Sequence, residues 1–360
     1  MQRNQPINHP GISALGILSR KAAMTLGCVL LLCACQAIAP TISDSPPIAE
    51  WEQFLRRHVH ADGRIIDGGS GGISHSEGQG FGMLLAVHFR DRAAFDRLYK
   101  WTRKNLMVRD DGLIAWRWSP QGEVTYRNNA TDGDIFVAWA LMRAGARWDS
   151  QEYLDAGLAL ARAIKEKLIR KTPRGLLLLP GVEGFESNNT IMLNLSYWVF
   201  PAFAEFSKTE RSPIWEELAQ SGHKLLAEAR FGRWGLPPNW LKHNGSLSLP
   251  NDREPRFGYD AIRIPLYLMW SGTNREAMQS YRAFWAHFSG ATFFPAWTNL
   301  KDDSVDSHDA PKGLRAIAAT AAAMPDLNRN ALPKMDDSQP YYSDVLLLLV
   351  GAMVWERTAR

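Results

Sequence analysis

The sequence predicts an all-α protein built from paired helices, and three observations support this class. From Ala49 onward, apolar residues recur mainly at the spacing of an amphipathic helix. Runs that alternate apolar and polar residues, as a half-buried strand would, are few. No repeat of constant period is found, which argues against a solenoid of short repeats. A toroid of paired helices with its loops gathered at one end would use these pieces economically, although periodicity alone establishes only a mostly helical chain.

The expected helices follow one another along the chain and are separated by long aromatic loops. The first starts directly after a proline-rich stretch, and the second begins with the apolar run Met83–Val87. The third follows an acidic glycine turn and contains the apolar run Ile135–Leu141. The others are placed by helical spacing, and loops such as 110–126, 233–256 and 292–306 are rich in Gly, Pro, Asn and Trp. The predicted helices are Ala49–His58, Gly82–Asn105, Asp134–Arg147, Gln151–Ile169, Leu195–Phe206, Ile214–Ala229, Asp260–Trp270, Glu276–Phe288, Pro311–Met324 and Tyr342–Thr358.

Composition indicates one globular domain preceded by a linker. A chain of 360 residues can bury a large core, and 46% hydrophobic with 22% charged residues is ordinary for a soluble globular protein. Residues 40–48 are polar and proline-rich, which predicts a linker. No interior break in composition follows, so residues 49–360 are expected to form a single domain.

The first 39 residues are typical of an export signal. Arg20 and Lys21 supply a positive flank, and the apolar stretch 22–34 is too short to span a bilayer comfortably. Small residues up to Ala39 offer a conventional cleavage site. The alternative is a lipoprotein signal cleaved before Cys35. We expect an exported protein, periplasmic or secreted, with an outer-membrane lipoprotein as the second choice.

The cysteines and the charge exclude several classes of function. All three cysteines lie inside the leader, so the mature protein has no disulfide, thiolate nucleophile or cysteine metal site. The formal charge is +4, and removing Arg3, Arg20 and Lys21 with the leader brings the balance close to neutral. A near-neutral chain argues against nucleic acid as a partner and suits an uncharged substrate.

Fourteen tryptophans, all at Trp51 or later, belong to the folded part of the chain. Most should be core residues, while aromatic faces in loops can also stack on sugar rings. Trp116 and Trp118 lie in such a loop, and one of the two is expected to pack inward.

The most informative segment is Ser-Glu-Gly-Gln-Gly-Phe-Gly-Met at 76–83, which places Glu77 on a glycine-rich bend before an apolar run. Burial at the start of a helix disfavours the charged carboxylate and raises its pKa toward that of a general acid. The alternative is a solvated acid that is favoured by the helix dipole.

Two further acidic clusters favour the general acid over the solvated carboxylate. Ala-Thr-Asp-Gly-Asp at 130–134 puts Asp132 and Asp134 just before an apolar helix, where either could also serve as a plain N-cap. In the cluster 257–265, Arg263 follows Asp260 by one helical turn. The pair could be a surface ion pair of little worth, or the guanidinium could keep Asp260 deprotonated, as a base toward water requires.

One protonated acid and one ionised acid is the arrangement that glycoside hydrolysis needs. The three motifs together resemble glycoside hydrolase family 8, and within it the endoglucanase branch associated with bacterial cellulose synthase. The stretch 76–83 is similar to the family's acid motif, and 130–148 follows its signature Ala-Thr-Asp-Gly-Asp, departing conservatively at Val137. Tyr-Asp-Ala-x-Arg-x-Pro at 259–265 resembles the third motif. The resemblance covers roughly residues 51–355.

The resemblance implies a fold, a mechanism and roles for single residues. It implies an (α/α)6 barrel whose active-site cleft is formed by loops at one end, with Glu77 as general acid and Asp260 as general base. The family inverts anomeric configuration, which requires carboxyl groups about 6.5–9.5 Å apart with a water between them. The substrate-binding residues implied are Asp132, which would hold the distorted sugar, together with Tyr197, Trp116, Trp118 and Arg263.

We therefore predict that the domain 49–360 is an endo-1,4-β-glucanase acting on cellulose-like β-1,4-glucan and linked to bacterial cellulose biosynthesis. The alternatives are a relative acting on mixed-linkage β-glucan, xylan or chitosan, a non-catalytic glucan-binding component of a cellulose-secretion system, and a polysaccharide lyase. We expect a monomer that associates with glucan and with the cellulose synthase machinery, and with a membrane only through a lipid at Cys35.

No cofactor and no catalytic metal are expected. The nine histidines show no His-Glu-x-x-His pair and no clustered ligand spacing. The glycine-rich stretch 68–72 looks superficially like a phosphate loop, but it lacks the preceding strand and the lysine that such a loop requires.

Overall fold

A computed structural model of the chain describes residues 46, 48–272, 276–291 and 293–359. The expected leader 1–39, with its alternative lipidation site at Cys35, lies outside the described residues, as does nearly all of the expected linker 40–48. These expectations therefore stay predictions.

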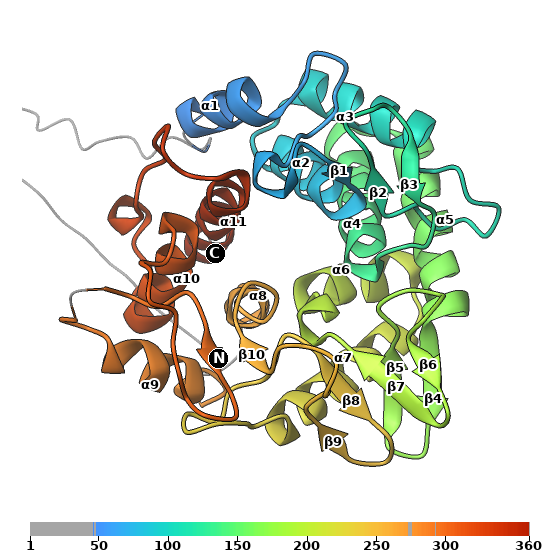
Figure 1. The fold of residues 1–360 in the computed structure, drawn as a ribbon. Helices are drawn as coiled ribbons and strands as arrows, with labels where there is room; N and C mark the ends of the chain where they lie inside the picture. The colour runs from blue at the N-terminus through green and yellow to red at the C-terminus, as the bar shows by residue number, and fades with distance from the viewer. Residues whose placement is uncertain (1–45, 47, 273–275, 292, 360) are drawn as a thin grey trace, which may run out of the picture. The chain divides into compact units, whose positions relative to one another are not determined.

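Helices dominate the described chain and surround a common centre in Figure 1. Each predicted helix has a counterpart, and most boundaries agree to within a few residues. The helices are α1 (Ala49–His58), α2 (Ser76–His88), α3 (Arg92–Asn105), α4 (Thr131–Trp148), α5 (Gln151–Leu168), α6 (Phe200–Glu210), α7 (Ile214–Glu228), α8 (Arg263–Ser271), α9 (Gln279–His287), α10 (Lys312–Ala323) and α11 (Tyr341–Thr358), with 3-10 turns η1 (Gly68–Ser70), η2 (Leu195–Tyr197) and η3 (Arg329–Ala331).

An inner ring of helices is closed by contacts in the order α2, α4, α6, α8 and α11, with α11 returning to α2. Helix α10 contacts both α8 and α11 at their junction. The remaining helices pack on these: α1 on α11, α3 on α2, α5 on α4, α7 on α6 and α9 on α10. With α10 counted in the ring, six inner helices carry a second layer of described outer helices, and the predicted (α/α)6 barrel is confirmed.

Two inner helices are buried on nearly all sides, as a helix enclosed by other helices must be. Every residue of α8 except its last is buried, as is most of α4. None of the helices in the described part of the chain combines the length and the hydropathy of a membrane span.

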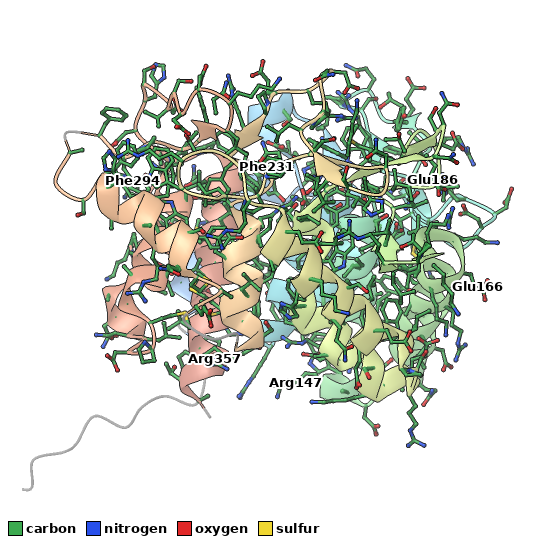
Figure 2. All side chains as sticks on the ribbon, turned by 90° about the horizontal axis from the view of Figure 1, so that it is seen from below. Arg147, Glu166, Glu186, Phe231, Phe294 and Arg357 are labelled. Carbon is green, nitrogen blue, oxygen red and sulfur yellow. The ribbon has the colours of Figure 1, made fainter. Side chains whose placement is uncertain are left out.

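Short antiparallel strands occupy the long loops. Figure 2 shows Glu186, Phe231 and Phe294 from these loops at one end of the barrel, and Arg147 and Arg357 from the ends of α4 and α11 at the other. The first sheet holds β1 (Ser74–His75), β2 (Arg117–Trp118) and β3 (Val124–Tyr126), and the second pairs β4 (Ile169–Thr172) with β5 (Gly175–Leu178). The third sheet holds β6 (Glu186–Ser187), β7 (Thr190–Leu193), β8 (Leu241–His243) and β9 (Leu247–Ser248), and the fourth pairs β10 (Arg256–Phe257) with β11 (Thr298–Asn299).

The predicted helix Gly82–Asn105 was wrong in two respects. The helix is interrupted between α2 and α3, where Arg90 adopts the left-handed conformation with φ of 59°. A right-handed helix cannot continue through such a residue. The glycine-rich segment before the apolar run is also helical and not a bend, since α2 already begins at Ser76. Glu77 therefore lies in the first turn of a buried helix.

Two glycines, one on α2 and one on α4, allow these helices to pack closely. A Cβ on Gly80 would stand 2.6 Å from Cβ of Phe136 on α4. A Cβ on Gly133 of α4 would stand 2.1 Å from Oγ of Ser76 and 2.8 Å from the backbone nitrogen of Glu77. The glycines thus let α2 and α4 approach along their first turns, which brings Asp132 beside Glu77.

Two helices that border the site begin later than predicted. The predicted helix Leu195–Phe206 starts as the 3-10 turn η2, and α6 begins only at Phe200. The predicted helix Asp260–Trp270 starts at Arg263, so Asp260 lies in the preceding turn. Both shifts leave polar residues at the mouth of the barrel instead of inside a helix.

A charged network joins the inner helices at the end where they finish. The Arg143 guanidinium on α4 donates to both carboxylate oxygens of Glu205 on α6 and, at 2.6 Å, to Glu356 on α11. Glu356 also accepts from the Trp270 indole of α8 at 2.8 Å, and the Arg143 guanidinium lies 4.4 Å from the Trp139 ring. One cation therefore joins three inner helices directly and a fourth through Glu356.

We expect Arg143→Met to lower the free energy of unfolding by about 2–4 kcal/mol, because it leaves two partly buried carboxylates without their cation. Chemical denaturation of the purified protein would measure the loss. Arg103→Met is the matched control, since Arg103 and its partner Glu152 are both mostly exposed and should contribute less than about 1 kcal/mol. Equal losses in the two variants would contradict a structural role for the network.

Candidate active site

Three carboxylates from distant parts of the chain meet around one buried guanidinium. Nη1 of Arg263, a side chain only 2% exposed, contacts Oε1 of Glu77 and lies 3.2 Å from Oδ2 of Asp132. Nη2 lies 3.4 Å from Oδ1 of Asp260 and donates to Oγ of Ser196 at 3.0 Å. The structure therefore brings together Glu77, Asp132 and Asp260, which the sequence places 183 residues apart from first to last.

The inner helices deliver these side chains from their N-terminal ends. Glu77 lies in the first turn of α2, Asp132 in the first turn of α4, and Arg263 begins α8. The unpaired N–H groups and the dipole of a helix N-terminus favour negative charge. Convergent helix starts thus offset part of the cost of gathering three carboxylates, and Arg263 offsets more.

Asp260 is positioned by a turn that a neighbouring loop fixes. Oδ1 of Asn239 accepts from the backbone nitrogens of Gly258 and Ala261, each at 3.0 Å. The Asp260 side chain remains 35% exposed, whereas that of Asp132 is 3% exposed. Of these two, Asp260 is the carboxylate that solvent water reaches.

Burial and, after it, the charge of Asp132 raise the pKa of Asp260 to about 7, while Asn194, Arg253 and Trp240 act to lower it. Burial likewise raises the pKa of Asp132 to about 7, against the Gly133 backbone N–H. The pair that the sequence suggests is formed, since Arg263 lies 3.4 Å from Asp260, and the role of Arg263 in keeping Asp260 deprotonated stays a prediction. A pKa near neutrality is suited to a general base.

Arg263 lies at the centre of the acidic cluster. Its guanidinium faces three carboxylates and Ser196, and its side chain is almost fully buried. This placement suits a residue that positions the carboxylates, and the implied contact of Arg263 with substrate stays a prediction.

Tyr197 ends the turn η2 and lies within this cluster. Its ring centroid is 5.9 Å from Cζ of Arg263, and the ring meets Trp240 edge-on at 6.3 Å. Burial, together with the charges of Asp132 and Asp260, raises the Tyr197 pKa well above its ordinary value. The phenol therefore stays neutral and can donate a hydrogen bond to a water or a sugar; its role in binding stays a prediction.

The two loop tryptophans differ in their surroundings. Trp118 packs against the core and meets the Trp101 ring edge-on at 5.6 Å, so it is the one that packs inward. Its predicted sugar contact stays a prediction. Trp116 meets Tyr126 edge-on at 5.8 Å, and that tyrosine is 53% exposed. The Trp116 carbonyl accepts from the backbone nitrogen of Ser76, which places this tryptophan next to the acid-bearing turn.

Several site residues were missed from the sequence. Asn194 and Trp240 both act on Asp260 and lower its pKa. Ser196 binds Arg263, and Asn239 fixes the Asp260 turn. Asn194 and Ser196 lie just before the candidate Tyr197, but their side chains carry no signal of a site in the sequence. Trp240 lies in the aromatic loop 233–256, but the sequence around it does not indicate an acidic neighbour.

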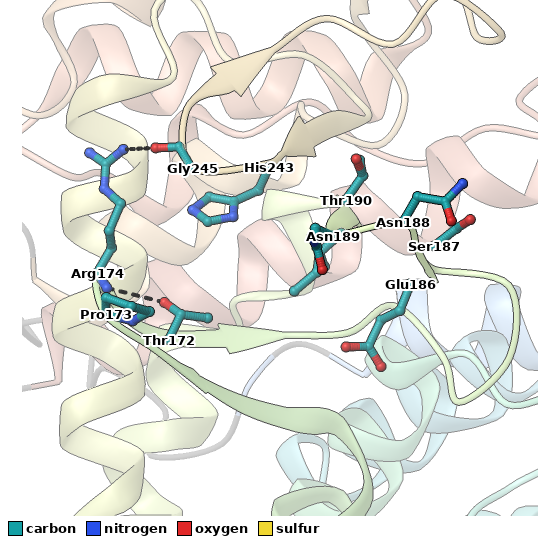
Figure 3. Close-up of a pocket in the computed structure, with 11 residues that line it drawn as sticks. Thr172, Pro173, Arg174, Glu186, Ser187, Asn188, Asn189, Thr190, His243 and Gly245 are labelled. Carbon is teal, nitrogen blue, oxygen red and sulfur yellow. Dashed lines mark hydrogen bonds between the residues drawn. The ribbon is translucent and has the colours of Figure 1, made fainter.

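A separate hollow of about 600 Å³ opens between the β4–β5, β6–β7 and β8–β9 turns (Figure 3). Arg174, Asn189 and His243 are among the side chains that line it. None of the predicted site residues does, so the chemistry is assigned to the acidic cluster.

Comparison with known proteins connects this geometry to one family. The family model described as glycosyl hydrolases family 8 matches residues 18–357. A probable endoglucanase of Novacetimonas hansenii is 37% identical over 86% of this chain and 92% of its own, and an endoglucanase of Cellulomonas uda is 35% identical over 81% and 82%. The crystal structure of the endo-β-1,4-glucanase of Acetobacter xylinum superposes with a TM-score of 0.80 at 36% identity, over 86% of this chain and 98% of that one.

Proposed function

Since this chain belongs to glycosyl hydrolases family 8 and is a glycoside hydrolase, we propose that it is an endo-1,4-β-glucanase that hydrolyses cellulose-like β-1,4-glucan with inversion of configuration. The observation that carries the proposal is the meeting of Glu77, Asp132 and Asp260 around Arg263 at the mouth of a helical barrel. The names of the relatives support the substrate class, because both are endoglucanases.

In the proposed mechanism, Glu77 donates its proton to the glycosidic oxygen while the bond between that oxygen and the anomeric carbon breaks. Asp260 accepts a proton from a water that attacks the same carbon from the opposite face. Asp132 stabilises the distorted ring as positive charge develops on it. The proton count balances, because Glu77 loses one proton and Asp260 gains one.

An uncharged polysaccharide agrees with the charge and the surface of the site. The chain without its leader is close to electrically neutral. Trp116 is partly exposed near the acidic cluster and offers an apolar surface for a sugar ring. A cationic polymer such as chitosan would instead favour a strongly acidic surface.

A panel of polymers tests the substrate class and the stereochemistry together. Reducing ends should appear fastest from carboxymethylcellulose and related β-1,4-glucans, and more slowly from xylan or chitosan. NMR of the first products should show the α-anomer forming before mutarotation. Fastest hydrolysis of another polymer would reassign the substrate, initial β-anomer would refute inversion, and unsaturated products absorbing in the ultraviolet would identify a lyase.

We further propose that the protein is exported and trims glucan for a bacterial cellulose synthase. The leader 1–39 supports export, and the resemblance to the synthase-associated branch supports the biological role. The mass of the mature N-terminus would distinguish soluble export after Ala39 from lipidation at Cys35. Failure to co-purify with the synthase from cellulose-producing cells would argue against the association.

A further inference from the structure

The glycine-rich loop 68–72, which the proposed chemistry does not use, folds against the start of α2. The backbone nitrogen of Asp67 donates to the Ile73 carbonyl at 2.8 Å, and that of Gly72 donates to the Asp67 carbonyl at 2.9 Å. Oδ1 of Asp67 accepts from the Ser70 nitrogen at 3.2 Å. The closed loop therefore holds the Asp67 side chain in one place.

Asp67 faces the histidine that caps α2. Its Oδ2 lies 3.6 Å from Nε2 of His75, and both side chains are nearly buried. Nδ1 of His75 accepts from the Gly78 backbone nitrogen at 3.0 Å and so satisfies a free donor of the first helical turn. A neutral imidazole has one protonated nitrogen and one acceptor. Nδ1 is the acceptor here, so the proton is on Nε2, toward Asp67.

The same histidine nitrogen lies beside the general acid. Nδ1 of His75 is 3.8 Å from Oε2 of Glu77, too far for a direct hydrogen bond but close enough for its charge to matter. Oε1 of Glu77 faces the Arg263 guanidinium, which can only donate. A protonated Glu77 therefore carries its proton on Oε2, the oxygen next to His75.

We propose that His75, oriented by Asp67, is a positioning residue that holds the proton-bearing oxygen of Glu77 and keeps an uncharged nitrogen beside it. The proposal rests on the proposed role of Glu77 as general acid. With Nδ1 accepting from the Gly78 nitrogen, His75 caps the acid's helical turn, while the Arg263 cation lies against the other oxygen of Glu77. An imidazolium would lose the cap and would favour the Glu77 carboxylate.

The surroundings of His75 supply one permanent negative charge. Burial pushes the Asp67 pKa upward, but interactions with His75 and Ser70 outweigh burial and leave that pKa lowered, so Asp67 is ionised. Burial raises the Tyr341 pKa, so this phenol, whose ring meets His75 edge-on at 6.1 Å, stays neutral. The charged or titratable groups that face His75 are Asp67, Glu77, Tyr341 and, through the field of the cluster, Asp132 and Arg263.

Three substitutions of His75 separate the cap from the charge. His75→Ala removes the cap and should lower kcat on carboxymethylcellulose about 10- to 100-fold, since a small misplacement of a catalytic group has effects of this size. His75→Asn can still cap and should stay within about threefold of the parent. His75→Asp also caps but adds a negative charge beside Glu77, which should move the basic limb of the pH profile upward by about one pH unit or more.

A substrate with a good leaving group shows whether the defect acts through the acid. A nitrophenyl β-cello-oligosaccharide needs little protonation of its leaving oxygen, so the His75→Ala defect should shrink on it. His60→Ala is the matched control, because His60 pairs with Asp62 at 2.9 Å on an exposed surface and should leave kcat unchanged.

Parent-like kcat in His75→Ala, an equal defect on both substrates, or an unmoved basic limb in His75→Asp would each overturn the proposal. Should His75→Ala fail to fold, the limb of His75→Asp still decides. Failure of the proposed function looks different, because then Glu77→Gln itself would keep its activity on the polymer.

Discussion

Glu77→Gln should lower kcat on carboxymethylcellulose about 10²- to 10⁴-fold, the contribution expected of a general acid. The amide cannot give up a proton to the glycosidic oxygen, but it fills the same space and its oxygen can still accept from Arg263. The fold should therefore persist, and the basic limb of the pH profile should disappear with the proton that it reports. Initial rates of reducing-end formation, with circular dichroism for the fold, measure both.

The control for this variant is Glu152→Gln, which neutralises a mostly exposed carboxylate on α5 and should leave turnover unchanged. The loss in Glu77→Gln should be much smaller on the nitrophenyl substrate, whose leaving group departs without help. Near-normal hydrolysis of the polymer by a folded Glu77→Gln protein would contradict the assignment of Glu77 as the general acid.

The helical class could be predicted because an inner helix of this barrel is apolar over long continuous runs. Ile135–Leu141 and Met83–Val87 both lie in buried helices, as their composition indicates. The boundary between α2 and α3 was missed because Arg90, which breaks the helix, carries no local signal such as glycine or proline. The ring itself could not be derived from periodicity, since closure depends on contacts between helices far apart in sequence.

The glycines of α2 illustrate a second limit. Locally, Gly78, Gly80 and Gly82 argue against a helix, because glycine lowers helix propensity. Close packing overrides this preference, since a Cβ on Gly80 or Gly82 would stand within 2.6 Å of a neighbouring side chain. A sequence shows the cost of such glycines but not the partner that requires them.

The acidic cluster was predictable in its members and not in its arrangement. Glu77, Asp132 and Asp260 each stand out at the start of an apolar helix or in a motif, and the barrel brings them together. The central position of Arg263 could not be foreseen, because the sequence shows only its neighbour Asp260 at i+3. Asn239 and Trp240 were missed for the same reason.

Asp260→Asn should also lower kcat about 10²- to 10⁴-fold, but with a different dependence on the substrate. The missing base is needed for attack by water whatever the leaving group, so the loss should persist on the nitrophenyl substrate. Added azide needs no base to attack and should restore part of the rate with a glycosyl azide as product. A defect that vanishes with the better leaving group would instead place Asp260 on the acid side of the reaction.

The pH profile tests the same carboxylate without removing it. Because the Asp260 pKa is raised to about 7, the base becomes protonated below that pH, and kcat/KM should fall as the pH drops through about 7. The negative charge of Asp132 contributes to that rise, so Asp132→Asn should lower the Asp260 pKa and move the acidic limb to lower pH. Turnover in this variant should also drop, because Asp132 is proposed to hold the distorted sugar; the position of the limb and not its height is therefore the measure. An acidic limb that stays in place after Asp132→Asn would show that the charge of Asp132 does not raise the Asp260 pKa, and the electrostatic coupling of the two carboxylates would have to be abandoned.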